Sequence, residues 1–244
     1  MNRVAMAGAL AIGLAAFSLG GKPGTPDQGG ATVMGRVRFT GTKPAMRRID
    51  MSEEAQCQAK YKGPPPTEET VLVGANGALA NTFVYIKSGL PASFKAAAAT
   101  TPVVIDQDGC RYKPHVFGLM VGQPLHIKNS DPLLHNIKSK GRANRPFNIS
   151  QPNVTRAPTV RTFTAPEVMV ALECNVHGWM QAYAGVLPHP FFAVTGADGS
   201  FTIKNLPAGT YTVEAWHERY GTQTATVTVA GTASATADFS FAGR

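Results

Sequence analysis

The sequence has few aromatic and few charged residues, and this shortage argues against one class of partner. Aromatic side chains make up 8% and charged side chains 16% of the 244 residues. The basic residues are scattered, with only Arg47 and Arg48 adjacent to each other. No aromatic residues alternate with them in the pattern typical of nucleic-acid binding. We therefore expect no nucleic-acid partner.

Signatures of catalysis are also missing. The sequence contains no recognisable nucleophile–base arrangement, no phosphate-binding loop and no pair of acids at a plausible site. The Cys-x-x-Cys-His run that attaches haem is absent. We also find no long helix and no tandem repeat. These absences lead us to expect that the protein is not an enzyme.

The composition favours an all-β protein. Apolar residues make up 43% of the chain, which is enough to bury a core, and 25 Gly and 18 Pro indicate many turns between short strands. The length allows one large domain or two small ones. The formal net charge is +8. This charge is either an ordinary solvated surface or a means of attracting an acidic partner.

The first residues are typical of an export signal. Arg3 is followed by an uncharged apolar run over 4–19 and then by a stretch rich in Gly, Pro and Asp over 20–31. We interpret residues 1–20 as a cleaved secretory signal, with an uncleaved anchor as the alternative. We thus expect a periplasmic or secreted protein without stable membrane insertion after the signal is removed.

Alternation of apolar and polar residues predicts a series of short strands. Residues 40–66 are expected to form a long loop with one helical turn around 52–59, and residues 138–156 to be polar and irregular. An Asn76-Gly77 turn is expected to join two of the strands. The expected strands are 32–39, 71–73, 80–87, 103–106, 116–121, 125–128, 135–137, 168–174, 183–187, 191–195, 200–204, 211–216, 222–229 and 237–241.

One short stretch carries the most chemical information. Cys174, His177 and Met180 place a thiolate, an imidazole and a thioether at i, i+3 and i+6. Thiolate and thioether favour reduced copper, and imidazole suits both oxidation states. A second imidazole must come from upstream, and His135 follows a predicted strand there. Two His, one Cys and a weak axial Met are the signature of type 1 (blue) copper sites for electron transfer.

Two sequence runs resemble the cupredoxin family, which includes plastocyanin and amicyanin. The first is CRYKPHVFGLMVGQPLHIKNSDPLLHNI, and the second is TFTAPEVMVALECNVHGWM. The resemblance covers about 101–187 and departs from the family at Pro166-Glu167, where a Pro-Gly turn is more usual. It implies a Greek-key β-sandwich.

The same resemblance assigns roles to the residues of the candidate site. It implies one mononuclear copper ion, with His135, Cys174 and His177 as equatorial ligands and Met180 as the axial one. Asn136 would brace the two ligand loops. The resemblance further implies an apolar docking patch around an exposed edge of His177.

The three cysteines then divide into a ligand and a pair. With Cys174 assigned as a ligand, Cys57 and Cys110 are expected to form a disulfide that pins the long loop to the copper domain. The alternative is that both are reduced and buried. For the site itself, zinc binding and simple core packing of Cys and Met are the alternatives to copper.

The C-terminal part resembles a second family. The run FFAVTGADGSFTIKNLPAGTYTVEAWHERYG resembles the carboxypeptidase regulatory-like domain, a transthyretin-like β-sandwich. Strands that this family has before that block occur only far upstream, around Gly35 and Val84. We therefore predict a discontinuous domain of residues 31–90 and 188–244, with the copper domain 101–187 inserted. Three consecutive modules are the alternative. The resemblance implies a scaffold or docking surface without a catalytic role.

Together these observations predict an exported copper-binding protein that carries one electron at a time to or from a redox partner protein. The alternatives are a non-redox copper-binding protein and a structural or adhesion protein. Of the other histidines, His126 is expected to be exposed and His115 to be structural. A second metal site at His189 or His217 is less favoured than ordinary packing.

Overall fold

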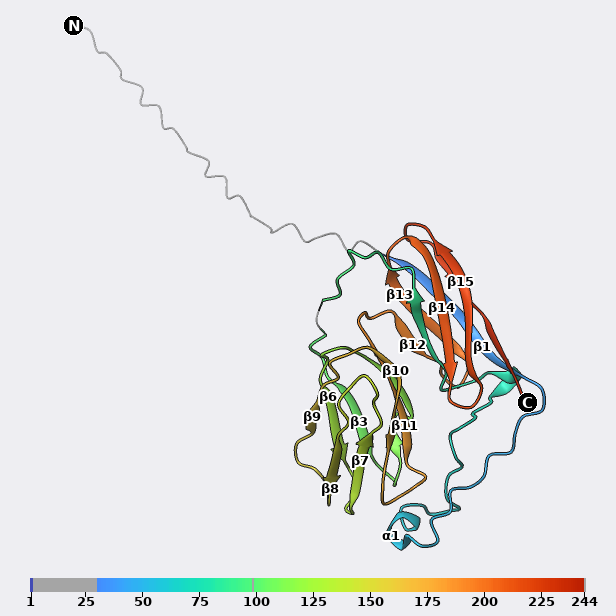
Figure 1. Ribbon diagram of the computed structural model, residues 1–244, viewed down its shortest axis with the longest axis vertical. Coiled ribbons are helices and arrows are strands. Elements are labelled where there is room, and N and C mark those ends of the chain that lie inside the picture. The colour runs from blue at the N-terminus through green and yellow to red at the C-terminus, as the bar shows by residue number, and fades with distance from the viewer. Residues whose placement is uncertain (2–29, 98, 244) are drawn as a thin grey trace.

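The computed structural model describes residues 1, 30–97 and 99–243, and in this part of the chain almost all regular structure is β (Figure 1). The strands form four sheets that pack in pairs as two sandwiches. The prediction of an all-β protein with two β-sandwiches is therefore confirmed. The predicted signal, 1–20, lies outside the described residues apart from Met1. No helix among the described residues is long and apolar enough to span a membrane.

The first sandwich combines strands from both ends of the chain. One sheet contains β1 (Ala31–Thr40), β13 (Ser200–Leu206), β16 (Ser234–Thr236) and β17 (Phe239–Ala242). The facing sheet has the order β12 (Phe192–Val194), β2 (Phe83–Ser88), β14 (Gly209–His217) and β15 (Gly221–Val229). Apolar residues of both sheets, for example in β1 and β15, alternate inward and share one buried core.

The second sandwich is formed by the middle of the chain. Its larger sheet has the order β5 (Val116–Met120), β11 (Gln181–Leu187), β10 (Glu167–Glu173), β7 (His135–Ser139) and β8 (Asn148–Gln151). The other sheet has the order β4 (Tyr112–Lys113), β3 (Val103–Gln107), β6 (Leu125–Asn129) and β9 (Thr159–Arg161). A separate apolar core lies between these two sheets.

The chain leaves the first sandwich and returns to it at neighbouring strands. β2 precedes the second sandwich and β12 follows it, and the two pair antiparallel with Val84 opposite Ala193. On its other side, Val84 lies opposite Ala215 of β14. Because the exit and the return are adjacent, the intervening strands need not disturb the sheet they interrupt.

The two sandwiches contact each other through a small aromatic cluster. Phe83 and Phe192 of the first sandwich pack towards Val116 and Leu187 of the second. The contact depends on Gly185, because a Cβ atom there would lie 2.3 Å from the ring of Phe83. Glycine thus allows the Phe83 ring to lie directly on the backbone of β11.

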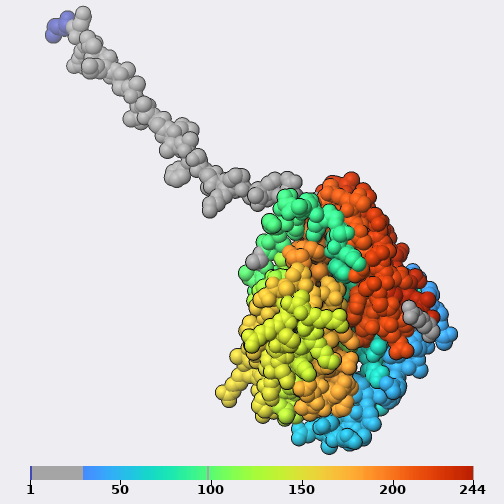
Figure 2. Space-filling view, in the orientation of Figure 1, coloured from blue at the N-terminus to red at the C-terminus, as the bar shows by residue number. Residues whose placement is uncertain are grey.

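A long irregular segment, residues 41–70, connects the first sandwich to the far end of the second, and we call it the cap. Figure 1 shows it running from β1 to α1 (Ala55–Gln58), which lies at one end of the second sandwich. In the space-filling view the cap covers the bottom of the molecule (Figure 2). Ile49, Met51 and Cys57 anchor it, because their side chains are buried in the core of the second sandwich.

Some elements differ from those expected. Residues 148–151, expected to be irregular, form β8, a mostly polar edge strand that pairs only with β7. The expected strand 71–73 is reduced to a single bridge between Val73 and Leu79. The turn between them is a short 3-10 helix, η1 (Ala75–Gly77), in which Asn76 and Gly77 both have positive φ.

Candidate metal centre

The three strongest candidate ligands meet at one end of the second sandwich. His135 is the first residue of β7, and Cys174 directly follows β10. These strands are antiparallel neighbours, so the start of β7 and the end of β10 lie at the same end of the sheet. His177 lies in the loop between β10 and β11.

The ligand atoms face one another. His135 Nδ1 lies 2.9 Å from His177 Nδ1, and Cys174 Sγ lies 3.7 Å from His177 Nδ1. The donor atoms of all three residues are within 4.8 Å of one another, and all three side chains are buried. Two nitrogen atoms and one sulfur atom at such separations are a suitable donor set for a transition-metal ion.

The loop that carries the thiol closes tightly on itself. The Cys174 N–H donates to the Met180 carbonyl oxygen at 3.2 Å, and the Met180 N–H donates to the His177 carbonyl oxygen at 2.9 Å. Met180 is buried in the same core as Cys174. The sequence prediction therefore named four residues that the fold brings to one buried region.

Asn136 connects the two ligand-bearing segments. Its Oδ1 accepts a hydrogen bond from the Asn175 N–H at 2.7 Å and lies 3.3 Å from Cys174 Sγ. Its Nδ2 donates to Asn148 Oδ1 at 2.7 Å. Tyr112, which the sequence did not single out, donates its hydroxyl hydrogen to the Asn136 carbonyl oxygen. These bonds hold β7 and the Cys174 loop together.

The environment of Cys174 favours its thiolate. Burial acts to raise the pKa of Cys174, but hydrogen bonds to His135 and His177 outweigh burial and lower this pKa to about 5. The thiol is therefore ionised at neutral pH, and the thiolate is the form that binds metals. Nearby, burial and the charge of Cys174 raise the pKa of Tyr112, which keeps that hydroxyl neutral.

The outer nitrogen of His135 is held by a buried carboxylate. His135 Nε2 lies 2.9 Å from Asp131 Oδ2. Burial acts to raise the pKa of Asp131, but hydrogen bonds from His135 and Lys60 hold it well below its usual range. Burial lowers the pKa of His135, whereas its hydrogen bonds to Asp131 and Cys174 give a net rise. Asp131 was not predicted from the sequence, although a carboxylate four residues before a candidate ligand was a usable signal.

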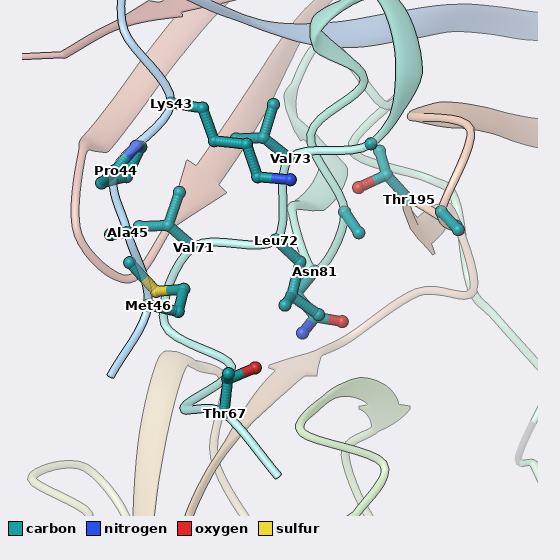
Figure 3. Close-up of a pocket in the computed structure, with 14 residues that line it drawn as sticks. Lys43, Pro44, Ala45, Met46, Thr67, Val71, Leu72, Val73, Asn81 and Thr195 are labelled. Atoms are coloured by element: carbon teal, nitrogen blue, oxygen red, sulfur yellow. The ribbon is translucent and has the colours of Figure 1, made fainter. Parts of the chain in front are cut away.

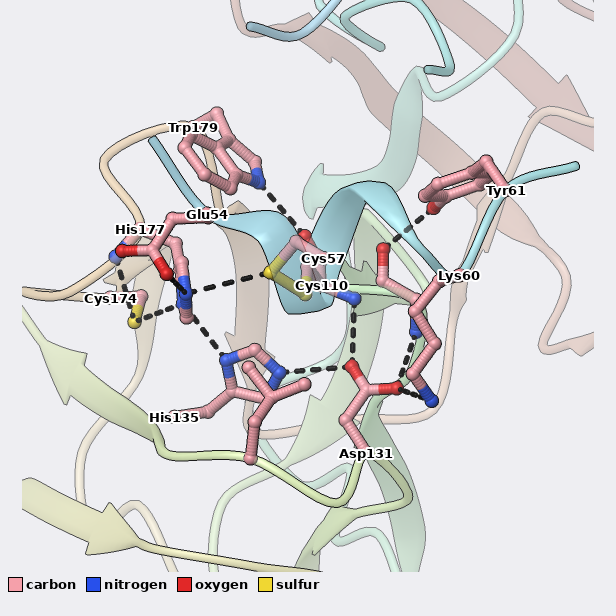
Figure 4. Close-up of a disulfide and its surroundings, with 12 residues drawn as sticks. Glu54, Cys57, Lys60, Tyr61, Cys110, Asp131, His135, Cys174, His177 and Trp179 are labelled. Carbon is pink, nitrogen blue, oxygen red and sulfur yellow. Dashed lines mark hydrogen bonds and ion pairs between the residues drawn. A yellow bond between two sulfur atoms is a disulfide. The ribbon is translucent and has the colours of Figure 1, made fainter. Parts of the chain in front are cut away.

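The prediction of an exposed His177 edge is wrong. His177 is 1% exposed, because the cap lies over its outer nitrogen (Figure 4). Cys57 Sγ is 3.6 Å and Glu54 Oε2 is 3.8 Å from His177 Nε2. Cys57 is bonded to Cys110, so the expected disulfide is present and lies against the candidate site.

The other histidines do not join this cluster. His115 contacts Glu218 of the first sandwich, and His126 is half-buried instead of exposed because β6 lies between β3 and β9. His189 and His217 are buried, and no group of three metal-binding side chains among the described residues includes either one.

An apolar pocket lies away from the candidate metal centre, between the cap and the first sandwich (Figure 3). Its volume is about 660 Å³, and Pro44, Met46, Val71 and Val73 contribute to its walls. None of the candidate ligands lines it. The chemistry of the donor atoms, not the size of a cavity, therefore identifies the candidate functional site.

Comparison with known proteins supports the second resemblance directly. Residues 188–242 match the model of the carboxypeptidase regulatory-like domain, and the resemblance is thus confirmed for this part of the chain. No curated protein sequence matches the chain.

Solved structures similar to the chain include cupredoxins. A copper-containing nitrite reductase from Thermus scotoductus is 20% identical, with a TM-score of 0.33, over 41% of this chain and 25% of its own. A mutant of amicyanin in its Cu(I) form is 19% identical, with a TM-score of 0.30, over 42% of this chain and 97% of its own. A purple cupredoxin from Nitrosopumilus maritimus is 21% identical, with a TM-score of 0.29, over 34% of this chain and 97% of its own.

Proposed function

We propose that the protein binds one copper ion and carries single electrons. The observation that carries this proposal is the convergence of the Nδ1 atoms of His135 and His177 on the low-pKa thiol of Cys174 in a buried pocket. Copper bound there would supply a one-electron couple between its two oxidation states. Met180 would add its thioether as a fourth donor.

The residues around the candidate ligands suit electron transfer. Asn136 holds the Cys174 loop against β7, and Asp131 holds the outer nitrogen of His135. A ligand set that is fixed before the metal binds reorganises little when the charge changes. The burial of all three ligands excludes water, and with it the coordination of a substrate.

The proposal extends to the setting in which the protein acts. A disulfide in a chain of this kind indicates an oxidising compartment, so we place the protein in the periplasm or outside the cell. Its net charge of +8 suits an acidic redox partner protein. We propose no catalytic activity, and we assign the carboxypeptidase regulatory-like sandwich a scaffolding role.

A visible absorption spectrum of the copper-loaded, oxidised protein tests the proposal. We expect an intense thiolate-to-copper band that is lost in Cys174→Ala and in His135→Ala. His126→Ala is the matched control, because His126 lies outside the cluster, and it should keep the band. A wild-type protein that shows no band at saturating copper, or that binds zinc in preference to copper, would contradict the proposal.

A further inference from the structure

The outer nitrogen atoms of both imidazoles face one buried group of residues. His177 Nε2 lies 3.6 Å from Cys57 Sγ, and His135 Nε2 lies 2.9 Å from Asp131 Oδ2 (Figure 4). Cys57 comes from α1 of the cap, and Asp131 comes from the loop before β7. The inner nitrogen atoms are therefore left to face each other and Cys174.

Cys110 links the contacts of the two imidazoles. It is disulfide-bonded to Cys57, and its N–H donates to Asp131 Oδ2 at 2.7 Å. Its carbonyl oxygen accepts a hydrogen bond from Trp179 Nε1 at 2.9 Å. The ring of Trp179 lies beside that of His177, with 5.2 Å between their centroids. One residue thus connects the surroundings of both histidines.

The cap reaches the same group through a second side chain. Lys60 Nζ lies 2.6 Å from Asp131 Oδ1. The Lys60 side chain is 28% exposed, whereas that of Asp131 is fully buried. Next to it, the Tyr61 hydroxyl donates to the Gly109 carbonyl oxygen at 2.6 Å. The Gly109 N–H in turn donates to Asp131 Oδ1 at 3.0 Å. The disulfide and Lys60 are therefore two separate connections between the cap and the histidines.

We propose that the Cys57–Cys110 disulfide and Lys60 are positioning residues of the metal centre. They hold both imidazoles at their outer nitrogen atoms and close the site to solvent. The disulfide acts on His177 directly and on His135 through Asp131, and Lys60 acts on His135 through Asp131. This inference rests on the proposed copper-binding function. It assigns the cap to control of access and geometry at the site.

The physical reason is that an imidazole bound through one nitrogen keeps its orientation only if the other nitrogen is held. Metal-binding histidines usually donate their second N–H to a carboxylate, a carbonyl or water, and loss of that partner costs roughly 10–100-fold in metal affinity. His135 has a carboxylate, but His177 has the disulfide sulfur and Glu54 in place of water. Removing the disulfide should therefore admit water at His177.

The first test uses Cys57→Ala/Cys110→Ala loaded with copper. We expect the thiolate-to-copper band to remain, because its ligands are intact, but to shift when azide is added. The wild-type band should not respond to azide. Transfer of copper to a chelator should be at least tenfold faster from the variant. A folded variant that matches the wild type in azide response and in copper release would overturn the role of the disulfide.

The second test keeps the disulfide and therefore does not depend on the folding of the double variant. Lys60→Met removes the ion pair with Asp131, and Lys62→Met is the matched control, because Lys62 is exposed and has no ion-pair partner among the described residues. We expect Lys60→Met to change the reduction potential and to speed copper release several-fold, whereas Lys62→Met should leave both unchanged. Identical behaviour of the two would overturn the role of Lys60.

The two proposals fail in different ways. If wild-type protein shows no copper band, the proposed function fails and this inference falls with it. If wild-type protein shows the band but neither the disulfide variant nor Lys60→Met differs from its reference, only the positioning role is wrong.

Discussion

His115 Nε2 lies 3.1 Å from Glu218 Oε1, and this pair joins the two sandwiches across 103 positions of the sequence. Both side chains are less than 10% exposed. The other ring nitrogen, Nδ1, lies 3.0 Å from the carbonyl oxygen of Gln181, which directly follows Met180. The first sandwich is therefore connected to the end of the candidate ligand loop through one histidine.

This pair predicts a pH-dependent contribution to stability. Burial lowers the pKa of His115, but Glu218 gives a net rise above the usual 6.5. Because the folded-state pKa exceeds the unfolded one, the contribution is fully present below about pH 6.5 and is lost as the pH rises through the raised value. Glu218→Gln should reduce the free energy of unfolding by about 1–3 kcal/mol at pH 5.5 and by less at pH 8.5.

Urea unfolding of wild type and Glu218→Gln across this pH range measures the effect. Glu53→Gln, which changes an exposed carboxylate of the cap, is the control. A destabilisation by Glu218→Gln that does not change with pH would contradict the charged His115–Glu218 pair.

Contact between the sandwiches depends on the absence of a side chain at position 185. A Cβ atom there would lie 2.3 Å from the Phe83 ring, so Gly185→Ala must displace that ring or the backbone. Such overpacking typically costs about 1–3 kcal/mol. Gly63→Ala is a matched control, because no heavy atom lies within 4 Å of its added Cβ. Equal urea midpoints for the two variants would show that the interface does not require this close approach.

Asn136 should affect the spectrum of the copper-loaded protein. Asn136→Ala removes the acceptor of the hydrogen bond from the Asn175 N–H, which holds the Cys174 loop against β7, and the amide oxygen that lies 3.3 Å from Cys174 Sγ. We expect a shifted thiolate-to-copper band and a changed reduction potential. Asn148→Ala is the control, because it removes the other hydrogen bond of Asn136 and leaves these two contacts intact. Identical spectra for the two variants would exclude a direct influence of Asn136 on the thiolate.

His217 should destabilise the fold in acid. Its ring stacks on Tyr220 with 4.9 Å between centroids, and burial lowers its pKa to about 4. Because the folded-state pKa lies below the unfolded value of 6.5, stability should fall as the pH drops from about 6.5 to 4, by at most about 3 kcal/mol.

The test is His217→Phe, which cannot titrate at this position. Between pH 7.5 and 4.5, its free energy of unfolding should decline less steeply than that of the wild type. His126→Gln, which replaces a half-buried histidine elsewhere, should decline as the wild type does. A parallel decline in His217→Phe and wild type would contradict the assignment.

Much of the fold was predictable, because alternation along a strand is a local property. The apolar positions of 32–39 and 222–229 predicted β1 and β15 nearly to their ends. β8 was missed because Ile149 is its only apolar residue, and its buried Gln151 is polar but hydrogen-bonds to Gln107 and to the backbone of β6. The strand expected at 71–73 was wrong for the opposite reason: it is apolar, but only one bridge pairs it.

The candidate ligands were visible in the sequence because three of them lie within one seven-residue stretch and their chemistry is specific. What covers them was not visible, because it comes from distant parts of the chain. Cys57 contacts His177 across 120 positions, and Lys60 reaches Asp131 only after the cap has crossed from the first sandwich to the second.

The sequence by itself therefore determined the all-β class and named a donor set. Only the tertiary structure decided that the outer edge of His177 is closed. The physical reason is that burial of a side chain depends on which remote segment packs over it, and local pattern carries no information about that segment.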